Sequence, residues 1–491
     1  MEANSSFFLF CQDEVFEYET YLLVKEFFPE KEIMRQKRSA DAFLVCNYGA
    51  EESSFVYALN GETGEIANPV SAPAGSKAFK NEHMHHLYEA LCAMTHKSLP
   101  WGSLTGVRPT KFAREMILSG KTEEEITSFY RDDRFVSEEK AGLAYSIAER
   151  ESKIIASTDS FDGYSLYIGI PFCPSRCLYC SFLSGPIAKW QSRIEEYLSC
   201  IEKELVFVSE TFKDKPLNTI YIGGGTPTAL SASELERLME MIHRFVNVKD
   251  TLEFTVEAGR PDSITEEKCR VLRSAGVNRI SVNPQTMNEE TLRIIGRNHT
   301  VEQTLEAYRM VSRAGFDNIN MDIILGLPKE GEREITRTME EIAACAPQSL
   351  TVHSLALKRS AEMKDWIKGL KDAESVFAED PAKMMEIACE YAQKMGLNPY
   401  YLYRQKNIAG NLENVGFAKE GKYGIYNILM MEEVQSIVAL GAGTVSKRVD
   451  SPTKIERCDT AKDIGLYMDR IDEMIERKRE LFSDARMGDV L

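Results

Sequence analysis

The alternation of strand-like and helix-like runs between about residues 160 and 357 constrains the fold of this chain most strongly. Strand-like runs are predicted at Leu166–Ile170, Thr219–Ile222, Leu252–Glu257, Arg279–Val282, Asn320–Leu325 and Leu350–His353. Helical patterns follow at Ile194–Thr211, Ser233–Phe245, Thr265–Ala275, Val301–Ala314 and Glu332–Ala344. Strands that alternate with helices in this way predict a parallel α/β sheet. Its natural closure is a partial (β/α)6 barrel, whose functional groups gather at the carboxyl ends of the strands.

The regions on either side of this alternation show other patterns. Residues 1–155 have short strand-like runs at Phe7–Phe10, Ala42–Cys46 and Phe55–Leu59, a predicted hairpin turn at Glu62–Glu65, and then helical patterns. They predict a small N-terminal α+β domain of unknown role. Residues 160–358 would form the barrel. Residues 359–491 are predicted to form a mainly helical C-terminal extension that covers the substrate.

Composition limits the class of protein and its partners. The chain has 491 residues, of which 43% are hydrophobic and 27% charged, a profile typical of soluble globular proteins. It lacks an apolar run of the ~18–20 residues that a membrane span needs. Its first residues have no basic segment of the kind that opens a signal peptide, so we expect a cytoplasmic protein. The net charge of −17 argues against a surface that binds nucleic-acid phosphates.

Three cysteines stand close together just after the first predicted barrel strand. Cys173, Cys177 and Cys180 have the spacing C-x3-C-x2-C. Three thiolates in one short loop can hold three irons of a [4Fe–4S] cube and leave the fourth iron open. Buried or zinc-binding cysteines are the alternative, but structural zinc needs four ligands and no fourth Cys or His lies nearby. The other eight cysteines are scattered, so they are interpreted as small buried apolar residues rather than a disulfide framework.

Polar or glycine-rich groups stand at the ends of the following predicted strands. Gly223–Thr228 (G-G-G-T-P-T) comes after the second strand, and its glycines allow the backbone to approach a ligand closely. Glu257 and Gln285 stand at the ends of the third and fourth predicted strands, and Arg297 lies in the loop after Gln285. Asp322 lies in the fifth predicted strand, which is followed by Gly326–Pro328. Any one of these residues alone is weak evidence for a binding site. Together, at successive strand ends beside the cysteine loop, they indicate one binding site.

Two features of the N-terminal region favour structural interpretations. The tract Glu82–His86 (E-H-M-H-H) resembles a metal site, but neighbouring helical positions point in different directions, which favours a solvated helix face. Trp101–Lys111 is a loop that leads into a helix. Its Arg108 and Lys111 could bind a carboxylate, although a packing loop is the favoured interpretation.

These motifs resemble the radical S-adenosylmethionine (SAM) superfamily. Y-I-G-I-P-F-C-P-S-R-C-L-Y-C, G-G-G-T-P-T, S-V-N-P-Q, G-R-N-H and M-D-I-I-L-G-L-P are similar, in order and spacing, to the oxygen-independent coproporphyrinogen III oxidases, over about residues 160–450. The N-terminal L-T-G-V-R-P-T-K is similar to the HemZ branch of that family. The resemblance implies a [4Fe–4S] cluster held by the three cysteines. It also implies SAM as a cofactor.

The resemblance further implies a role for each SAM-site residue. Tyr167 matches a SAM-contacting tyrosine. Residues that would serve the amino acid end of SAM are Gly224, Gly225 and Thr226 along the methionyl group, Glu257 at the amino group and Arg297 at the carboxylate. Gln285 and Asp322 would bind the ribose hydroxyls, and Ala356 and Val445 match contacts near the adenine only weakly.

The implied reaction is oxidative decarboxylation of coproporphyrinogen III propionates to vinyl groups, giving protoporphyrinogen IX. A reduced flavodoxin or ferredoxin-type donor would supply electrons. The tetrapyrrole substrate is acidic, so basic side chains should surround it, and the candidates are Arg108, Arg176, Arg404 and Lys406.

Two departures from the family leave rival functions open. Some family oxidases carry a further cysteine at the place of Phe182. The haem-chaperone branch carries H-N-x-x-Y where this chain has Tyr426–Met430 (Y-N-I-L-M), which counts against a non-enzymatic haem chaperone. Radical SAM methylation or ring opening of haem or another tetrapyrrole is the other rival.

Overall fold

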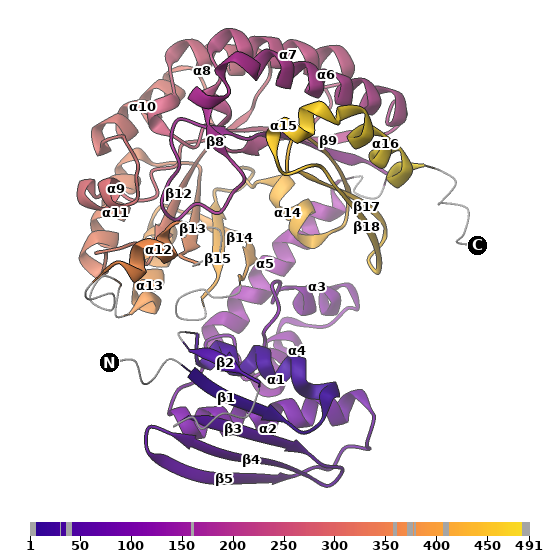
Figure 1. The fold of residues 1–491 in the computed structure, drawn as a ribbon, viewed down its shortest axis with the longest axis vertical. Coiled ribbons are helices and arrows are strands. Elements are labelled where there is room, and N and C mark those ends of the chain that lie inside the picture. The colour runs from indigo at the N-terminus through magenta and orange to yellow at the C-terminus, as the bar shows by residue number, and fades with distance from the viewer. Residues whose placement is uncertain are drawn as a thin grey trace. The chain divides into compact units, whose positions relative to one another are not determined.

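The computed structural model describes residues 6–29, 31–35, 42–158, 162–356, 361–370, 377, 380–405 and 412–483. The chain divides into two compact units (Figure 1). One comprises Met1–Glu149 with Tyr403–Glu413, and the other comprises Arg150–Leu402 with Asn414–Leu491.

The larger unit is built on six parallel strands that lie side by side in chain order. They are β6 (Tyr164–Ile170), β9 (Leu217–Gly224), β10 (Glu253–Glu257), β11 (Arg279–Ser281), β12 (Ile319–Leu325) and β13 (Ser349–Ser354). Each overlaps a strand that the sequence predicts. The α/β fold with parallel strands is therefore confirmed. Because all six strands run the same way, their carboxyl ends lie along one edge of the sheet.

Helices connect these strands and cover the sheet. They are α6 (Ile194–Thr211), α7 (Ala232–Phe245), α8 (Glu266–Ser274), α9 (Glu289–Ile294), α10 (Val301–Arg313) and α11 (Glu332–Cys345). Figure 1 shows α6, α7, α8 and α10 in an arc on the outer side of the strands. Ser231 begins α7 with a capping box completed by Glu234, which satisfies two backbone N–H groups at the helix start. Leu205, Leu238 and Ile222 belong to the buried apolar cluster between these helices and the sheet.

The C-terminal residues extend the same sheet at both edges. At one edge lie β14 (Asn398–Tyr403) and β15 (Asn414–Ala418), and at the other lie β16 (Ser436–Leu440), β17 (Val445–Ser451) and β18 (Lys454–Asp459). The mainly helical interpretation of this region omits these five strands. The helices there are α12 (Met363–Lys368), α13 (Pro381–Lys394), α14 (Ile425–Glu432), α15 (Ile464–Asp469) and α16 (Ile471–Phe482).

The smaller unit has a five-stranded sheet in the order β2-β1-β3-β4-β5. The strands are β1 (Ser6–Cys11), β2 (Glu32–Met34), β3 (Phe43–Tyr48), β4 (Glu52–Leu59) and β5 (Glu62–Pro69). The helices that begin in this unit are α1 (Glu14–Phe27), α2 (Lys77–Thr95), α3 (Lys111–Leu118), α4 (Glu123–Ser128) and α5 (Glu138–Ala156). The predicted turn at Glu62–Glu65 is wrong, because those residues begin β5. The β4–β5 turn is Asn60-Gly61, whose φ values of 52° and 84° suit a tight hairpin turn.

The histidine tract on α2 differs from its predicted solvated face. His83 is fully buried, and its Nδ1 lies 2.6 Å from the hydroxyl of Ser53 on β4. The ring of His83 also contacts Phe16 and Phe79 edge-on. His83 is therefore a hydrogen-bonded core residue. Among the helices of the described residues, none is long and apolar enough to cross a membrane.

Candidate active site at the strand ends

The three cysteines lie in the loop that follows β6. Cys173 ends the short strand β7 (Phe172–Cys173), which pairs with β8 (Gly185–Pro186). The backbone N–H of Cys180 donates to the carbonyl of Cys177 at 3.0 Å, which closes a turn between them. Cys177 is buried and the other two are half-buried. Burial raises the pKa of the Cys180 thiol, and the negative charges of Cys177 and Cys173 act on it in the same direction.

This arrangement suits a cluster rather than a single metal ion. In the described part of the chain, no three His, Cys, Asp or Glu side chains form a group that could hold one metal ion. A cubane requires a different arrangement, since each thiolate binds its own iron at a separate corner. The donor set of three neighbouring thiols in one loop fits that requirement.

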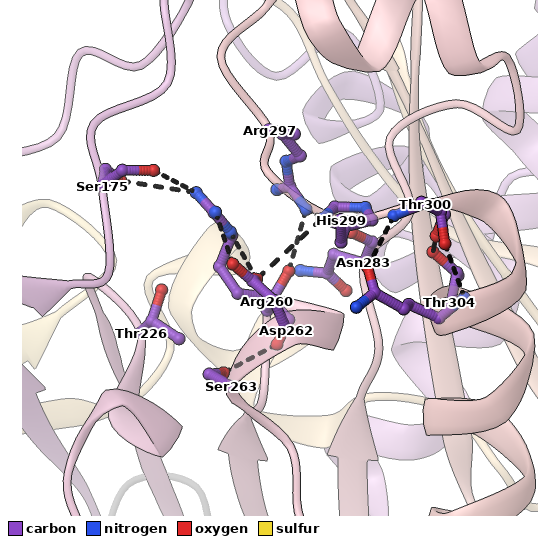
Figure 2. Close-up of polar contacts among 12 residues, drawn as sticks. Ser175, Thr226, Arg260, Asp262, Ser263, Asn283, Arg297, His299, Thr300 and Thr304 are labelled. Carbon is purple, nitrogen blue, oxygen red and sulfur yellow. Dashed lines mark hydrogen bonds and ion pairs between the residues drawn. The ribbon is translucent and has the colours of Figure 1, made fainter.

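Two side chains from other strand ends donate to the cysteine sulfurs. Thr226, which follows β9, places its hydroxyl 3.5 Å from the sulfur of Cys173. Arg260, which follows β10, places Nη1 3.5 Å from the sulfur of Cys177. Figure 2 shows Arg260 among the residues around it. Sequence reasoning missed Arg260, although its place three residues after Glu257, at a strand end, was a usable signal.

The predicted glycine run brings the end of β9 against the cysteine loop. Gly225 N–H donates to Ile170 at 2.8 Å, and Thr226 N–H donates to Phe172 at 2.7 Å. A Cβ at Gly225 would lie 2.6 Å from the carbonyl oxygen of Phe172, and Gly224 has a φ of 105°. These two positions therefore accept only glycine without rearrangement.

Glu257 lies beside Gly223 in a tyrosine-rich corner of the site. A Cβ at Gly223 would lie 3.1 Å from the Glu257 carboxylate. The hydroxyl of Tyr221 donates to Glu257 at 2.5 Å. Burial raises the pKa of Glu257 to about 7, although the hydrogen bond from Tyr221 opposes that rise. The ring of Tyr221 stacks on Tyr426 of α14 with centroids 4.5 Å apart, and Tyr167 stacks with both.

Arg297 is buried and held mainly by backbone carbonyls. Its Nη1 donates to Asn283 at 2.6 Å and to Gly259 at 3.2 Å, and Nη2 donates to the hydroxyl of Tyr179 at 3.1 Å. Its Nε has no hydrogen-bond partner among the described residues. Figure 2 shows Arg297 above Asn283, between His299 and Arg260.

Other buried polar atoms nearby also lack partners. Asn283 Oδ1 and Gln285 Oε1 are buried and make no hydrogen bond to any described residue. Gln285 has a φ of 68°, a left-handed conformation that is costly for a residue with a side chain and that recurs at functional sites. Buried polar groups are normally paired, so these atoms, with Arg297 Nε, mark a place for a polar ligand.

Asp322 is fixed by its neighbours on β12 and β13. The amide of Asn320 donates to Asp322 at 2.6 Å, and His353 Nε2 lies 3.8 Å from its other oxygen. Burial alone would raise the pKa of Asp322. The His353 ring and the Asn320 amide outweigh that effect and hold the pKa below its usual value. Asp322 is therefore an ionised acceptor in the site.

The residues predicted near the adenine, and the basic residues predicted to bind the substrate, differ in their exposure. Ala356 follows β13 and is half-buried, whereas Val445 begins β17 and is exposed. Among the basic candidates for substrate binding, Arg176 is partly exposed and lies 3.7 Å from Glu362. Arg108 is half-buried in the smaller unit, and Lys406 lies outside the described residues.

Arg404 does not fit the proposed substrate-binding role. It is buried in the smaller unit, with Nη1 on the carbonyl of Leu104 and Nη2 3.2 Å from Glu26. Its backbone N–H donates to Val107. A basic residue that follows aromatic residues has the same sequence pattern whether it binds a substrate or another part of the chain.

Comparisons with known proteins agree with this arrangement. Residues 167–342 match the radical SAM superfamily model. The chain is 42% identical over 409 residues to the oxygen-independent coproporphyrinogen-III oxidase-like protein HemZ of Bacillus subtilis, covering 82% of this chain and 81% of that protein. It is 32% identical over 282 residues to the haem chaperone HemW of the same organism, covering 57% of this chain and 69% of that protein.

The fold also matches a solved structure. The coproporphyrinogen III oxidase HemN of Escherichia coli, described as a radical SAM enzyme, superposes with a TM-score of 0.52 at 22% sequence identity. The match covers 66% of this chain and 72% of that one. At this identity the likeness establishes the fold.

Proposed function

Because the chain belongs to the HemZ-like, oxygen-independent coproporphyrinogen III oxidase-like family of radical SAM proteins, we propose that it decarboxylates coproporphyrinogen III oxidatively. Two propionate side chains would become vinyl groups, giving protoporphyrinogen IX. The observation that carries the proposal is the series of SAM-suited groups along successive strand ends beside the cysteine loop.

Members of the radical SAM superfamily bind a [4Fe–4S] cluster and SAM. We assign the cluster to Cys173, Cys177 and Cys180, which lie within eight residues of one another in the loop after β6. The unpaired buried atoms of Asn283, Gln285 and Arg297 support a polar cofactor beside it.

Several of the SAM-site residues have surroundings that suit the proposed roles. Glu257 would accept a hydrogen bond from the amino group of SAM, and Arg297 would pair with its carboxylate. Gly224, Gly225 and Thr226 would line the methionyl chain, since the two glycines let the end of β9 pack closely against the loop that carries the cysteines. Asp322, which is ionised, and Gln285 would accept from or donate to the ribose hydroxyls.

When bound, the cluster and SAM would supply a radical that can take a hydrogen atom from a propionate. The carboxylate then leaves as CO₂, and one electron passes to an acceptor, which balances the conversion of each propionate to a vinyl group. Radical SAM enzymes need an electron donor, and we propose a reduced flavodoxin or ferredoxin-type protein. The task of the chain is to orient the reacting groups and exclude water around them.

A haem chaperone is the second candidate function, since the haem chaperone HemW is 32% identical to this chain. The position of Tyr426 argues against it. Tyr426 stands where the chaperone branch has the histidine of H-N-x-x-Y, and it is buried, with its ring stacked on Tyr221 and also on Tyr167. Burial also raises the pKa of its hydroxyl, which disfavours the phenolate form that would bind haem iron.

The deciding experiment is anaerobic turnover. The reconstituted protein is incubated with coproporphyrinogen III, SAM and a reductant, and the products are identified by mass spectrometry. We expect a product that has lost CO₂ and two hydrogens at each of two propionates, and we expect no product without SAM. Methylated or linearised tetrapyrrole would contradict the proposal. Stable stoichiometric haem binding without SAM cleavage would favour the chaperone.

A further inference from the structure

Arg260 is almost fully buried against the cysteine loop. Its side chain is 3% exposed, and Nη1 donates to the sulfur of Cys177 at 3.5 Å. The same nitrogen lies 3.1 Å from the hydroxyl of Ser175 and 3.4 Å from its carbonyl oxygen. Figure 2 shows Arg260 extending toward Ser175, away from Arg297. None of the roles proposed for SAM binding involves the side chain of Arg260.

The guanidinium is held in one orientation by its own loop. Asp262 accepts from Nε at 2.9 Å and from Nη2 at 2.8 Å, a two-point contact that fixes the plane of the group. The hydroxyl of Ser263 donates to the Arg260 carbonyl at 2.7 Å and so fixes the loop backbone. With two nitrogens held by Asp262, Nη1 is directed at the loop that carries Cys177.

His299 contributes no charge to this group. It is buried 3.9 Å from Asp262, and neither ring nitrogen has a hydrogen-bond partner among the described residues. Burial, reinforced by the positive charge of Arg297, lowers the pKa of His299 to about 3. The ring is therefore neutral at physiological pH, and the cation in hydrogen-bond contact with Cys177 is Arg260.

A buried positive charge in contact with a cluster thiolate would change the reduction potential of the cluster. Reduction adds one negative charge to the cluster and its thiolates. A nearby positive charge stabilises the reduced form more than the oxidised form, and the effect is strong where water is excluded. A hydrogen bond to a ligand sulfur acts in the same direction, because it draws electron density from the iron.

We propose that Arg260 is a positioning residue that raises the reduction potential of the [4Fe–4S] cluster through its hydrogen bond to Cys177. Asp262 orients it for that contact. The inference rests on the proposed assignment of Cys177 as a cluster ligand. It does not depend on which tetrapyrrole the enzyme accepts.

The test compares the cluster potential of three variants with that of the full-length reconstituted protein. Reduced cluster is measured by EPR at a series of fixed potentials, with iron content and melting temperature as checks. Arg260→Gln removes the charge, and we expect the ratio of reduced to oxidised cluster at a fixed potential to fall about tenfold. This corresponds to a shift of about 59 mV for a one-electron couple. Arg260→Lys keeps a charge but loses the two-point contact with Asp262, so the ratio should fall by a smaller factor.

The control is Arg448→Gln. Arg448 is 4% exposed and contacts Asp450 and Glu456, so it matches Arg260 in burial and in its carboxylate partners, but its contacts are to the β17–β18 hairpin and to α16. It should leave the ratio unchanged.

The outcomes separate this inference from the proposed function. An unchanged ratio in Arg260→Gln, or an equal fall in Arg448→Gln, would overturn the inference. If Arg260→Gln does not retain its cluster, Arg260→Lys decides: a lower ratio supports the inference, and a wild-type ratio overturns it. If the variants show the expected changes in the ratio of reduced to oxidised cluster but the wild type forms no vinyl product, the proposed reaction is contradicted. The inference about Arg260 would still stand. If the Cys177→Ala variant keeps a cluster like that of the wild type, the assignment of Cys177 as a cluster ligand is wrong.

Discussion

Tyr221 donates its phenolic hydrogen to Glu257 at 2.5 Å, from the neighbouring strand of the sheet. The pair joins the end of β9 to the end of β10, just beside the glycine run. Burial raises the pKa of Glu257 to about 7, and the hydrogen bond from Tyr221 is the largest effect that opposes this rise. The proposed acceptor for the amino group of SAM therefore changes its charge near physiological pH.

SAM binding should weaken as the pH falls through about 7. Above that pH Glu257 is ionised and accepts strongly from the amino group, whereas below it the carboxyl is neutral. We expect the affinity for SAM to fall by up to about tenfold for each pH unit below 7, measured by equilibrium binding to the reconstituted protein. Glu257→Gln should bind weakly with no such dependence.

Tyr221→Phe should shift the same profile. The hydrogen bond that Tyr221 donates favours the ionised carboxylate, so its loss raises the pKa of Glu257 further. The midpoint of SAM binding should therefore move to higher pH. Binding that shows the same midpoint in this variant as in the wild type would contradict the assigned role of Tyr221.

Cys177→Ala should abolish the cluster. With only two thiolates left in the loop, we expect loss of the iron–sulfur absorbance, of bound iron and of SAM cleavage. Cys269→Ala is the matched control, because Cys269 is also buried but lies on α8. Retention of the cluster in Cys177→Ala, or its loss in Cys269→Ala, would be inconsistent with the ligand assignment.

Gly225→Ala should disturb the cysteine loop. The new methyl group would lie 2.6 Å from the carbonyl oxygen and 2.8 Å from the nitrogen of Phe172, which are backbone atoms that cannot move independently. We expect a loss of about 1–3 kcal/mol in the free energy of unfolding, measured by urea denaturation, together with reduced iron content.

Gly259→Ala is the control for that change. The nearest atom to a Cβ there is the side-chain nitrogen of Asn283 at 3.7 Å, an ordinary contact distance. This variant should keep the iron content and stability of the wild type. Equal losses in both variants would show that the close approach at Gly225 is not the cause.

The sequence predicted the central sheet because its strands and helices have strong, regular patterns. It missed β14–β18 because short strands at sheet edges depend on what they pair with. The partner of β16, for example, is β6, more than two hundred and fifty residues earlier in the chain. The turn predicted at Glu62–Glu65 lies instead at Asn60-Gly61, a pair that matches a tight hairpin turn because both residues take a positive φ.

The sequence predicts those site residues whose place on a strand is sufficient to bring them into the site. Glu257 is found this way because it ends β10, and strand ends in a parallel sheet share an edge. Asp322 lies in the middle of β12, so only its place on the fifth strand could be used to predict it. The contact between Arg260 and Cys177 joins two loops about eighty residues apart, and a sequence pattern does not say in which direction a loop side chain points. The same limit explains Arg404, whose partners are Leu104 and Glu26 rather than a substrate.

Glu413 should be essential to the stability of the smaller unit. It is fully buried, accepts from Trp101 Nε1 at 2.7 Å and pairs with Lys140 at 2.8 Å. Glu413→Gln would leave the buried ammonium of Lys140 without this charge, at a cost of about 3 kcal/mol in the free energy of unfolding. Glu139→Gln is the control, because Glu139 also lies near Lys140 but is largely exposed, and it should cost less than about 1 kcal/mol. Urea denaturation that shows equal effects would mean that burial does not decide the strength of the Glu413–Lys140 pair.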